Sequence, residues 1–108
     1  MHKFLYKTLF KMTKFGEIIS VNKPVLIDFY TDWSEFEPSL DTLRDVAAAL
    51  GDKAKVIKID IKKNEILAEA LRVKGNPTFM IYKEGEMKWR QTGEQDANTL
   101  IGLVQQYV

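Results

Sequence analysis

The side chains best suited to chemistry lie close together in the sequence, within and just after one apolar run. They are Asp28, Ser34, Glu35 and Glu37. Paired carboxylates can perform acid–base catalysis or bind a hard cation, and a serine becomes a nucleophile when a base activates it. The one histidine of the chain is His2, far from Ser34 in the sequence, so no such base is evident. The pattern therefore favours neither a serine nucleophile nor a metal site.

The composition excludes several other classes of function. The 108 residues contain no cysteine, and disulfides, thiolate metal sites and thiol–disulfide exchange all require one. The 16 Lys and Arg residues nearly balance the 15 Asp and Glu residues, so the overall charge does not favour nucleic acid as a partner. No apolar run approaches the ~20 residues of a membrane-spanning helix. We therefore expect one globular domain that neither binds nucleic acid nor inserts into a membrane.

The elements that position the chemical side chains can be read from the spacing of apolar residues. Apolar or alternating runs predict strands, and apolar residues at helical spacing predict helices. Asn64 and Asp96 are suited to capping the starts of helices, and Gly51 and Gly75 to ending them. This pattern predicts an α/β fold in which a mixed central β-sheet has helices on both faces. The strands are expected at residues 25–30, 55–61, 78–82 and 87–92, with a hairpin turn at 83–86, and the helices at 40–50, 64–73 and 96–107.

The N-terminus, residues 1–14, is expected to be a leading strand or helix that packs against a domain formed by residues 15–108. It carries several lysines among apolar residues, so a basic amphipathic surface helix is an alternative. Met12 is an alternative start of the chain. Lys7 interrupts the apolar residues and no small-residue cleavage site follows, which argues against a signal peptide. The cytoplasm is therefore the default expectation for location.

The segment after the first expected strand, Trp33-Ser34-Glu35-Phe36-Glu37, resembles the active-site segment of the thioredoxin family, in which Trp-Cys-Gly-Pro-Cys opens a helix. The positions of the two cysteines fall on Ser34 and Glu37. Asp28 and Lys58 are similar to the buried acid of that family and to the lysine beside it. The resemblance extends from about Phe15 to the end of the chain. It implies a thioredoxin-like fold with a degenerate active site.

Two further segments carry the resemblance. Gly75-Asn76-Pro77-Thr78 is similar to the loop whose cis-proline lies against the active site, and Gly93 is similar to the glycine that lines the substrate groove. In the family, this loop and the tryptophan flank a shallow apolar groove, and the backbone beside the proline pairs with an extended peptide. That recognition needs no thiol, because main-chain hydrogen bonds supply it.

The replaced motif has two local interpretations. Ser34 and Glu37 form the S-x-x-E pattern of a capping box. Alternatively, Glu37 precedes the helix and Pro38 is its first residue, where proline is favourable. If Glu37 points inward, it could approach Asp28, and the pKa of one of the two carboxyl groups should then rise.

These observations predict a redox-inactive thioredoxin-like protein that binds a protein or an extended peptide in the groove. No catalytic residue, cofactor or metal is expected, and the oligomeric state stays open. The alternative, by homology alone, is a thiol–disulfide oxidoreductase of cell redox homeostasis whose activity is lost or depends on the thiols of a partner. A further alternative is that Trp33 and Phe36 only pack locally. The predicted binding residues are Trp33, Ser34, Phe36, Asn76, Pro77, Thr78 and Gly93.

Overall fold

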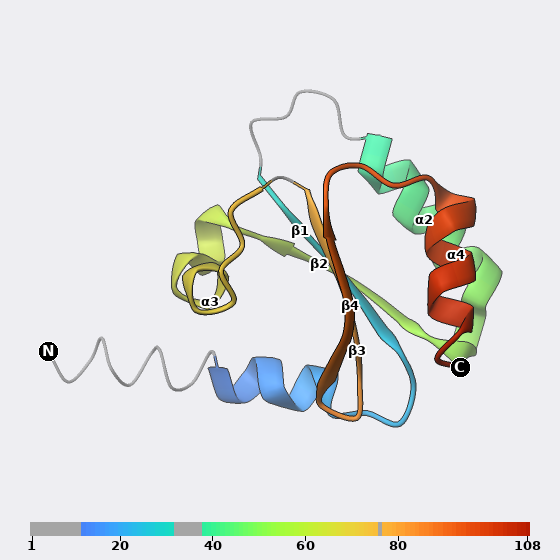
Figure 1. Ribbon diagram of the computed structural model, residues 1–108, viewed down its shortest axis with the longest axis horizontal. Helices are drawn as coiled ribbons and strands as arrows, with labels where there is room; N and C mark the ends of the chain where they lie inside the picture. The colour runs from blue at the N-terminus through green and yellow to red at the C-terminus, as the bar shows by residue number, and fades with distance from the viewer. Residues whose placement is uncertain (1–11, 32–37, 76) are drawn as a thin grey trace, which may run out of the picture.

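The computed structural model describes residues 12–31, 38–75 and 77–108. Its centre is a four-stranded sheet with helices on both faces (Figure 1). The strands are β1 (Val25–Tyr30), β2 (Lys55–Asp60), β3 (Thr78–Lys83) and β4 (Glu86–Thr92). The helices are α2 (Pro38–Leu50), α3 (Glu65–Ala70) and α4 (Ala97–Gln105), together with a helix over residues 12–19 and short 3-10 turns at Gly51–Lys53 and Lys62–Asn64. The predicted order of strands and helices is confirmed.

The sheet has the strand order β2-β1-β3-β4. β1 and β2 run parallel, which brings Asp28 beside Lys58 and Tyr30 beside Asp60. β3 runs antiparallel to both β1 and β4, and it brings Thr78 beside Thr92. The predicted mixed sheet is therefore present.

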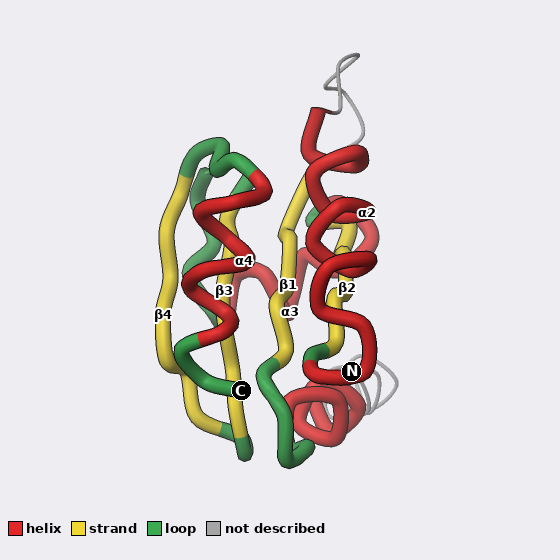
Figure 2. The backbone as a smooth tube through the Cα atoms, turned by 90° about the vertical axis from the view of Figure 1, so that its right-hand side faces the viewer, coloured by secondary structure: helices red, strands yellow, loops and turns green. Residues whose placement is uncertain are grey.

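Each face of the sheet has its own apolar cluster, because alternate residues of a strand point to opposite faces. Leu26 packs with residues of α2 and α4 on one face. Ile27 and Phe29 pack with residues of α3 and of the helix over residues 12–19 on the other face. Figure 2 shows α2 and α4 in front of the sheet and α3 behind it. Asp28 has the same parity as Leu26, so its side chain lies on the face that α2 and α4 cover.

The helix over residues 12–19 contributes side chains to the apolar cluster that contains Ile27 and Phe29. Phe15 and Ile19 are buried in it, and Met12 and Ile18 pack against it. The domain boundary expected between residues 14 and 15 falls within this helix. In the described part of the chain, no helix is both long and apolar enough to cross a bilayer.

The helix α3 differs from its prediction. It ends at Ala70 rather than near residue 73, and Arg72, not Gly75, adopts the left-handed backbone, with φ +56°. Asn64 occupies the N-cap position without a capping side-chain bond, because its amide donates to the carbonyl oxygen of Asp60 at 2.9 Å. The predicted cap at Asn64 and the predicted helix end at Gly75 are therefore wrong.

Other local predictions are confirmed. Asp96 caps α4, since its carboxylate accepts a 2.7 Å hydrogen bond from the backbone N–H of Thr99. Gly51 follows α2 with φ +53°. The hairpin between β3 and β4 turns at Glu84 and Gly85, whose φ angles are +53° and +83°. Positive φ at both positions is typical of a type I′ turn, whose twist matches that of the flanking strands.

Candidate functional site

Three of the predicted binding residues meet at one end of the sheet. Pro77 and Thr78 enter β3, and Gly93 directly follows β4. The backbone N–H of Gly93 donates a 2.8 Å hydrogen bond to the carbonyl oxygen of Pro77. Since β1 and β2 finish at the same end of the sheet, the loop at Pro77 lies at the carboxyl ends of the parallel strands. Ligands of open α/β sheets commonly bind at this end.

The hydroxyl of Thr78 ties the loop to the sheet. Thr78 is completely buried, and its Oγ1 donates a 2.7 Å hydrogen bond to the carbonyl oxygen of Gly75. Oγ1 of Thr78 also lies 3.2 Å from Oγ1 of Thr92. A buried hydroxyl without partners would destabilise the fold. These contacts therefore favour one conformation of the loop that precedes β3.

Gly75 lies too close to Thr92 for any larger residue. A Cβ atom built on Gly75 would stand 2.1 Å from Cγ2 of Thr92, well inside van der Waals contact. The sequence predicted Gly75 as the end of a helix and as part of the loop that carries the family resemblance, and it did not single out Thr92. The sequence did contain one signal of this contact, a glycine directly before an Asn-Pro turn. At this position the glycine allows close packing and does not end a helix.

Asp28 is buried on β1, two residues before the end of that strand. Its side chain is 1% exposed, and its neighbours in register are Lys58 on β2 and Phe79 on β3. The ammonium group of Lys58 lies 5.3 Å from the centroid of the Tyr30 ring. Lys58 is thus on the strand position beside Asp28, with its charged end over an aromatic ring. The neutralising role expected for Lys58 stays a prediction.

A second buried acid, Asp60, was missed by the sequence analysis. It is 6% exposed, and its Oδ1 accepts a 2.9 Å hydrogen bond from the backbone N–H of Lys62. Its Oδ2 has no hydrogen-bond partner among the residues that the structure describes. Asp60 pairs in register with Tyr30, at the same end of the sheet as Asp28 and on the same face. In the sequence, Asp60 occupies a polar position of an alternating strand, and a charged residue at such a position is usually exposed to solvent.

The remaining predicted binding residues, Trp33, Ser34, Phe36 and Asn76, lie outside the described residues, as does Glu37. The geometry of the peptide bond before Pro77, the capping alternatives for α2 and the approach of Glu37 to Asp28 all stay predictions for this reason.

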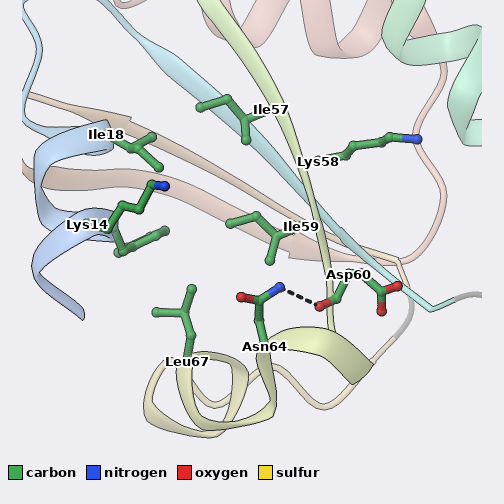
Figure 3. Close-up of a pocket in the computed structure, with 9 residues that line it drawn as sticks. Lys14, Ile18, Ile57, Lys58, Ile59, Asp60, Asn64 and Leu67 are labelled. Carbon is green, nitrogen blue, oxygen red and sulfur yellow. Dashed lines mark hydrogen bonds between the residues drawn. The ribbon is translucent and has the colours of Figure 1, made fainter. Parts of the chain in front are cut away.

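A separate pocket lies on the other face of the sheet. It has a volume of about 420 Å³ and is bounded by the helix over residues 12–19, β2 and the start of α3. Its walls are mainly apolar, and Figure 3 shows Lys58 extending away from it. The apolar residues that line it are Phe15, Ile18, Ile57, Ile59 and Leu67. Pro77, Thr78 and Gly93, the predicted binding residues within the described ranges, do not line this pocket.

The polar side chains of residues 12–31, 38–75 and 77–108 can be compared with the needs of a metal ion. No group of three or more His, Asp or Glu side chains in these ranges is arranged to hold a metal ion. The polar groups at the end of the sheet are instead main-chain amides and carbonyls, threonine hydroxyls and two buried acids.

The comparisons with known proteins all indicate the same family. A thioredoxin family model matches residues 7–106. A thioredoxin-like protein of Synechocystis sp. is 31% identical over 100 residues, which cover 91% of this chain and 95% of that protein. Chloroplastic thioredoxin Y of Oryza sativa subsp. japonica is 36% identical over 95 residues, which cover 86% of this chain. The chain spans only 56% of the length of the rice protein.

Solved structures agree with this similarity. A variant of the thioredoxin of Halobacterium salinarum NRC-1 superposes with a TM-score of 0.73 at 35% identity, covering 88% of this chain and 83% of that one. Mitochondrial thioredoxin 3 of Saccharomyces cerevisiae has a TM-score of 0.78 at 23% identity, with 88% and 89% of the two chains covered. At 23% identity, the similarity to the yeast protein indicates a shared fold and nothing more.

Proposed function

Since the chain belongs to the thioredoxin family, we propose that it is a redox-inactive member that binds an extended segment of a partner protein. The proposed site is the end of the sheet at Pro77, Thr78 and Gly93, completed by Trp33, Ser34, Phe36 and Asn76. The observation that carries the proposal is the hydrogen bond from the N–H of Gly93 to the carbonyl oxygen of Pro77, in a chain of 108 residues without cysteine.

The first part of the proposal follows from the chemistry of exchange. Thiol–disulfide exchange needs a thiolate that attacks a disulfide sulfur and forms a mixed disulfide. A serine hydroxyl and a carboxylate, which stand at the two cysteine positions of the family motif, form no such intermediate. The chain therefore lacks the reacting atoms of the family.

The second part rests on what the chain retains. Thr78 is buried and bonded to Gly75, and Gly93 is bonded to Pro77. A loop held in this way presents its main chain in a fixed shape, which lowers the entropy lost when a peptide binds. Binding through main-chain hydrogen bonds uses no thiol. Binding of a peptide at this end of the sheet would thus need neither of the two missing thiols.

The test is a titration of the ¹⁵N-labelled chain with an unfolded polypeptide, reduced and S-alkylated α-lactalbumin, followed by amide-resolved NMR. We expect saturable shifts that are largest at Thr78 and Gly93. Pro77→Ala should weaken this binding. The matched control is Met87→Ala, because Met87 is an exposed apolar residue, 44% accessible, at the opposite end of β4. It should bind like the unchanged protein.

Two results would overturn the proposal. The first is an absence of shifts at Thr78 and Gly93, or shifts confined to the pocket near Ile18 and Leu67, which would move the function to another face. The second is reduction of insulin disulfides by the chain above the dithiothreitol background. That result would favour the alternative, an oxidoreductase that depends on other thiols.

A further inference from the structure

Arg90, in the middle of β4, makes a two-pronged contact with the end of α3. Its Nη1 donates to the carbonyl oxygen of Leu71 and its Nη2 to that of Arg72, both at 2.6 Å. The partners are 19 and 18 residues away in sequence. Hydrogen bonds from a guanidinium are stronger than those between neutral groups, and two parallel bonds also fix direction.

The contact lies where the chain leaves α3 in an unfavourable conformation. Arg72 has φ +56°, in the left-handed region that residues with a Cβ rarely adopt. The amides of Leu71, Arg72 and Val73 still donate back into α3. The carbonyl groups of Leu71 and Arg72 instead point at Arg90. The guanidinium therefore stabilises a turn that the residues of the turn do not themselves favour.

The same strand holds the rest of the connection between α3 and β3. Arg90 and Thr92 are two positions apart and share one face of β4. Thr92 packs against Gly75 and lies 3.2 Å from the hydroxyl of Thr78, and the N–H of Gly93 binds the carbonyl oxygen of Pro77. β4 thus contacts the beginning, the middle and the end of the connection.

We propose that Arg90 is a positioning residue for the proposed binding site: by clamping the carbonyl groups of Leu71 and Arg72, it sets the direction in which the chain leaves α3 and so the placement of Gly75 and Pro77. The inference rests on the proposed function for its effect on binding. The clamp itself is a separate claim about the loop. A lysine is a poor replacement for the guanidinium here, because an ammonium on a flexible stem lacks the rigid fork that directs two N–H groups at two separate carbonyl oxygens.

The test compares Arg90→Lys and Arg90→Gln with a matched control, Arg72→Gln. The control removes one positive charge from an exposed side chain at the same turn and leaves both clamped carbonyl groups in place. Three quantities are measured: the Kd for S-alkylated α-lactalbumin, the amide shifts and hydrogen-exchange rates at Gly75, Thr78 and Gly93, and the midpoint of urea unfolding.

Both Arg90 variants should weaken binding tenfold or more and speed exchange at those three amides, whereas the amide of Val46 in the opposite layer should not change. Arg72→Gln should match the unchanged protein in all three measurements. Should Arg90→Gln fail to fold, Arg90→Lys, which keeps the charge and the aliphatic stem, decides the question.

Full binding by Arg90→Lys, or weaker binding with unchanged amides at Gly75, Thr78 and Gly93, would overturn the proposal. If the unchanged protein does not bind the polypeptide, the proposed function fails. The exchange rates and shifts of the Arg90 variants then decide the clamp alone, since they need no ligand.

Discussion

The N–H of Gly93 donates a 2.8 Å hydrogen bond to the carbonyl oxygen of Pro77, one step beyond the last paired residues of β3 and β4, Thr78 and Thr92. The bond extends the strand ladder into the loop, and Gly93 makes it with φ +104°. Residues with a Cβ are strained in this region. The loop conformation is therefore linked to the identity of residue 93.

Gly93→Ala should destabilise the fold by roughly 1–3 kcal/mol, the usual strain of such a backbone conformation. No atom of the residues that the structure describes lies within 4 Å of a Cβ built on Gly93, so the expected loss comes from backbone strain rather than from a clash with them. Urea unfolding measures the free energy. The control is Gly16→Ala, in the helix over residues 12–19, which has equally open space and should gain roughly 0.5–1 kcal/mol. A loss of equal size in both variants would contradict the assignment.

Gly75→Ala should destabilise the fold through a clash, by about 1–3 kcal/mol, because the new Cβ would meet Cγ2 of Thr92 at 2.1 Å. The second substitution Thr92→Ser removes that methyl group and leaves the hydroxyl near Thr78. The double variant Gly75→Ala/Thr92→Ser should therefore be more stable than Gly75→Ala alone. Additive losses in this double-mutant cycle, measured by urea unfolding, would show that the two residues do not interact.

Much of the fold could be predicted because its signals are local. Alternation along β2, the apolar run of β1 and the Glu84-Gly85 turn each depend on neighbouring residues, and each was present as expected. The resemblance to a family predicted that Pro77 and Gly93 line the same groove, whereas the hydrogen bond between them is a finding of the structure, since nothing in the spacing of these two residues indicates a contact.

What the sequence could not indicate depends on tertiary contacts or on competition between local bonds. Arg90 reaches carbonyl groups 18 and 19 residues away, a distance without periodic signal. Asn64 has the composition of a helix cap, but its amide bonds the carbonyl oxygen of Asp60 instead. Short polar side chains often form such alternative local bonds. The burial of Asp60 was hidden because its strand alternates like a half-exposed one.

Asp96 should make the stability of α4 depend on pH on the acid side. The hydrogen bond from the backbone N–H of Thr99 holds the pKa of Asp96 below its ordinary value. A lowered pKa in the folded state means that this stabilisation is present above the unfolded pKa, about 3.9, and is lost as pH falls through the folded value. Asp96→Asn still caps the helix but does not titrate.

The free energies of unfolding of the unchanged protein and of Asp96→Asn should therefore keep a constant difference from pH 7 to about pH 4 and converge below about pH 4, as the pH falls through the lowered pKa of folded Asp96. Urea unfolding at a series of pH values measures the difference. Curves that stay parallel below about pH 4 would show that Asp96 contributes no titrating cap.

Tyr82 should make the fold less stable on the alkaline side. Burial raises the pKa of Tyr82, and the nearby positive charge of Arg90 only partly opposes that effect. The side chain is 5% exposed and its ring packs edge-on against Phe15, with centroids 5.6 Å apart. Because the folded state holds the phenol proton more tightly, the associated stability is complete below the unfolded pKa of about 10 and is lost as pH rises through the folded value.

Tyr82→Phe keeps the ring contact with Phe15 and removes the proton. Its free energy of unfolding should fall less between about pH 9 and pH 11 than that of the unchanged protein, whose remaining titrating groups are the same. Arg90→Gln offers an independent check, since loss of the positive charge should raise the pKa of Tyr82 further. The difference between the ultraviolet titrations of Arg90→Gln and of Arg90→Gln/Tyr82→Phe separates the phenolate of Tyr82 from those of the other three tyrosines. A lower pKa of Tyr82 in Arg90→Gln would mean that the guanidinium acts on Tyr82 by excluding water and not by its charge.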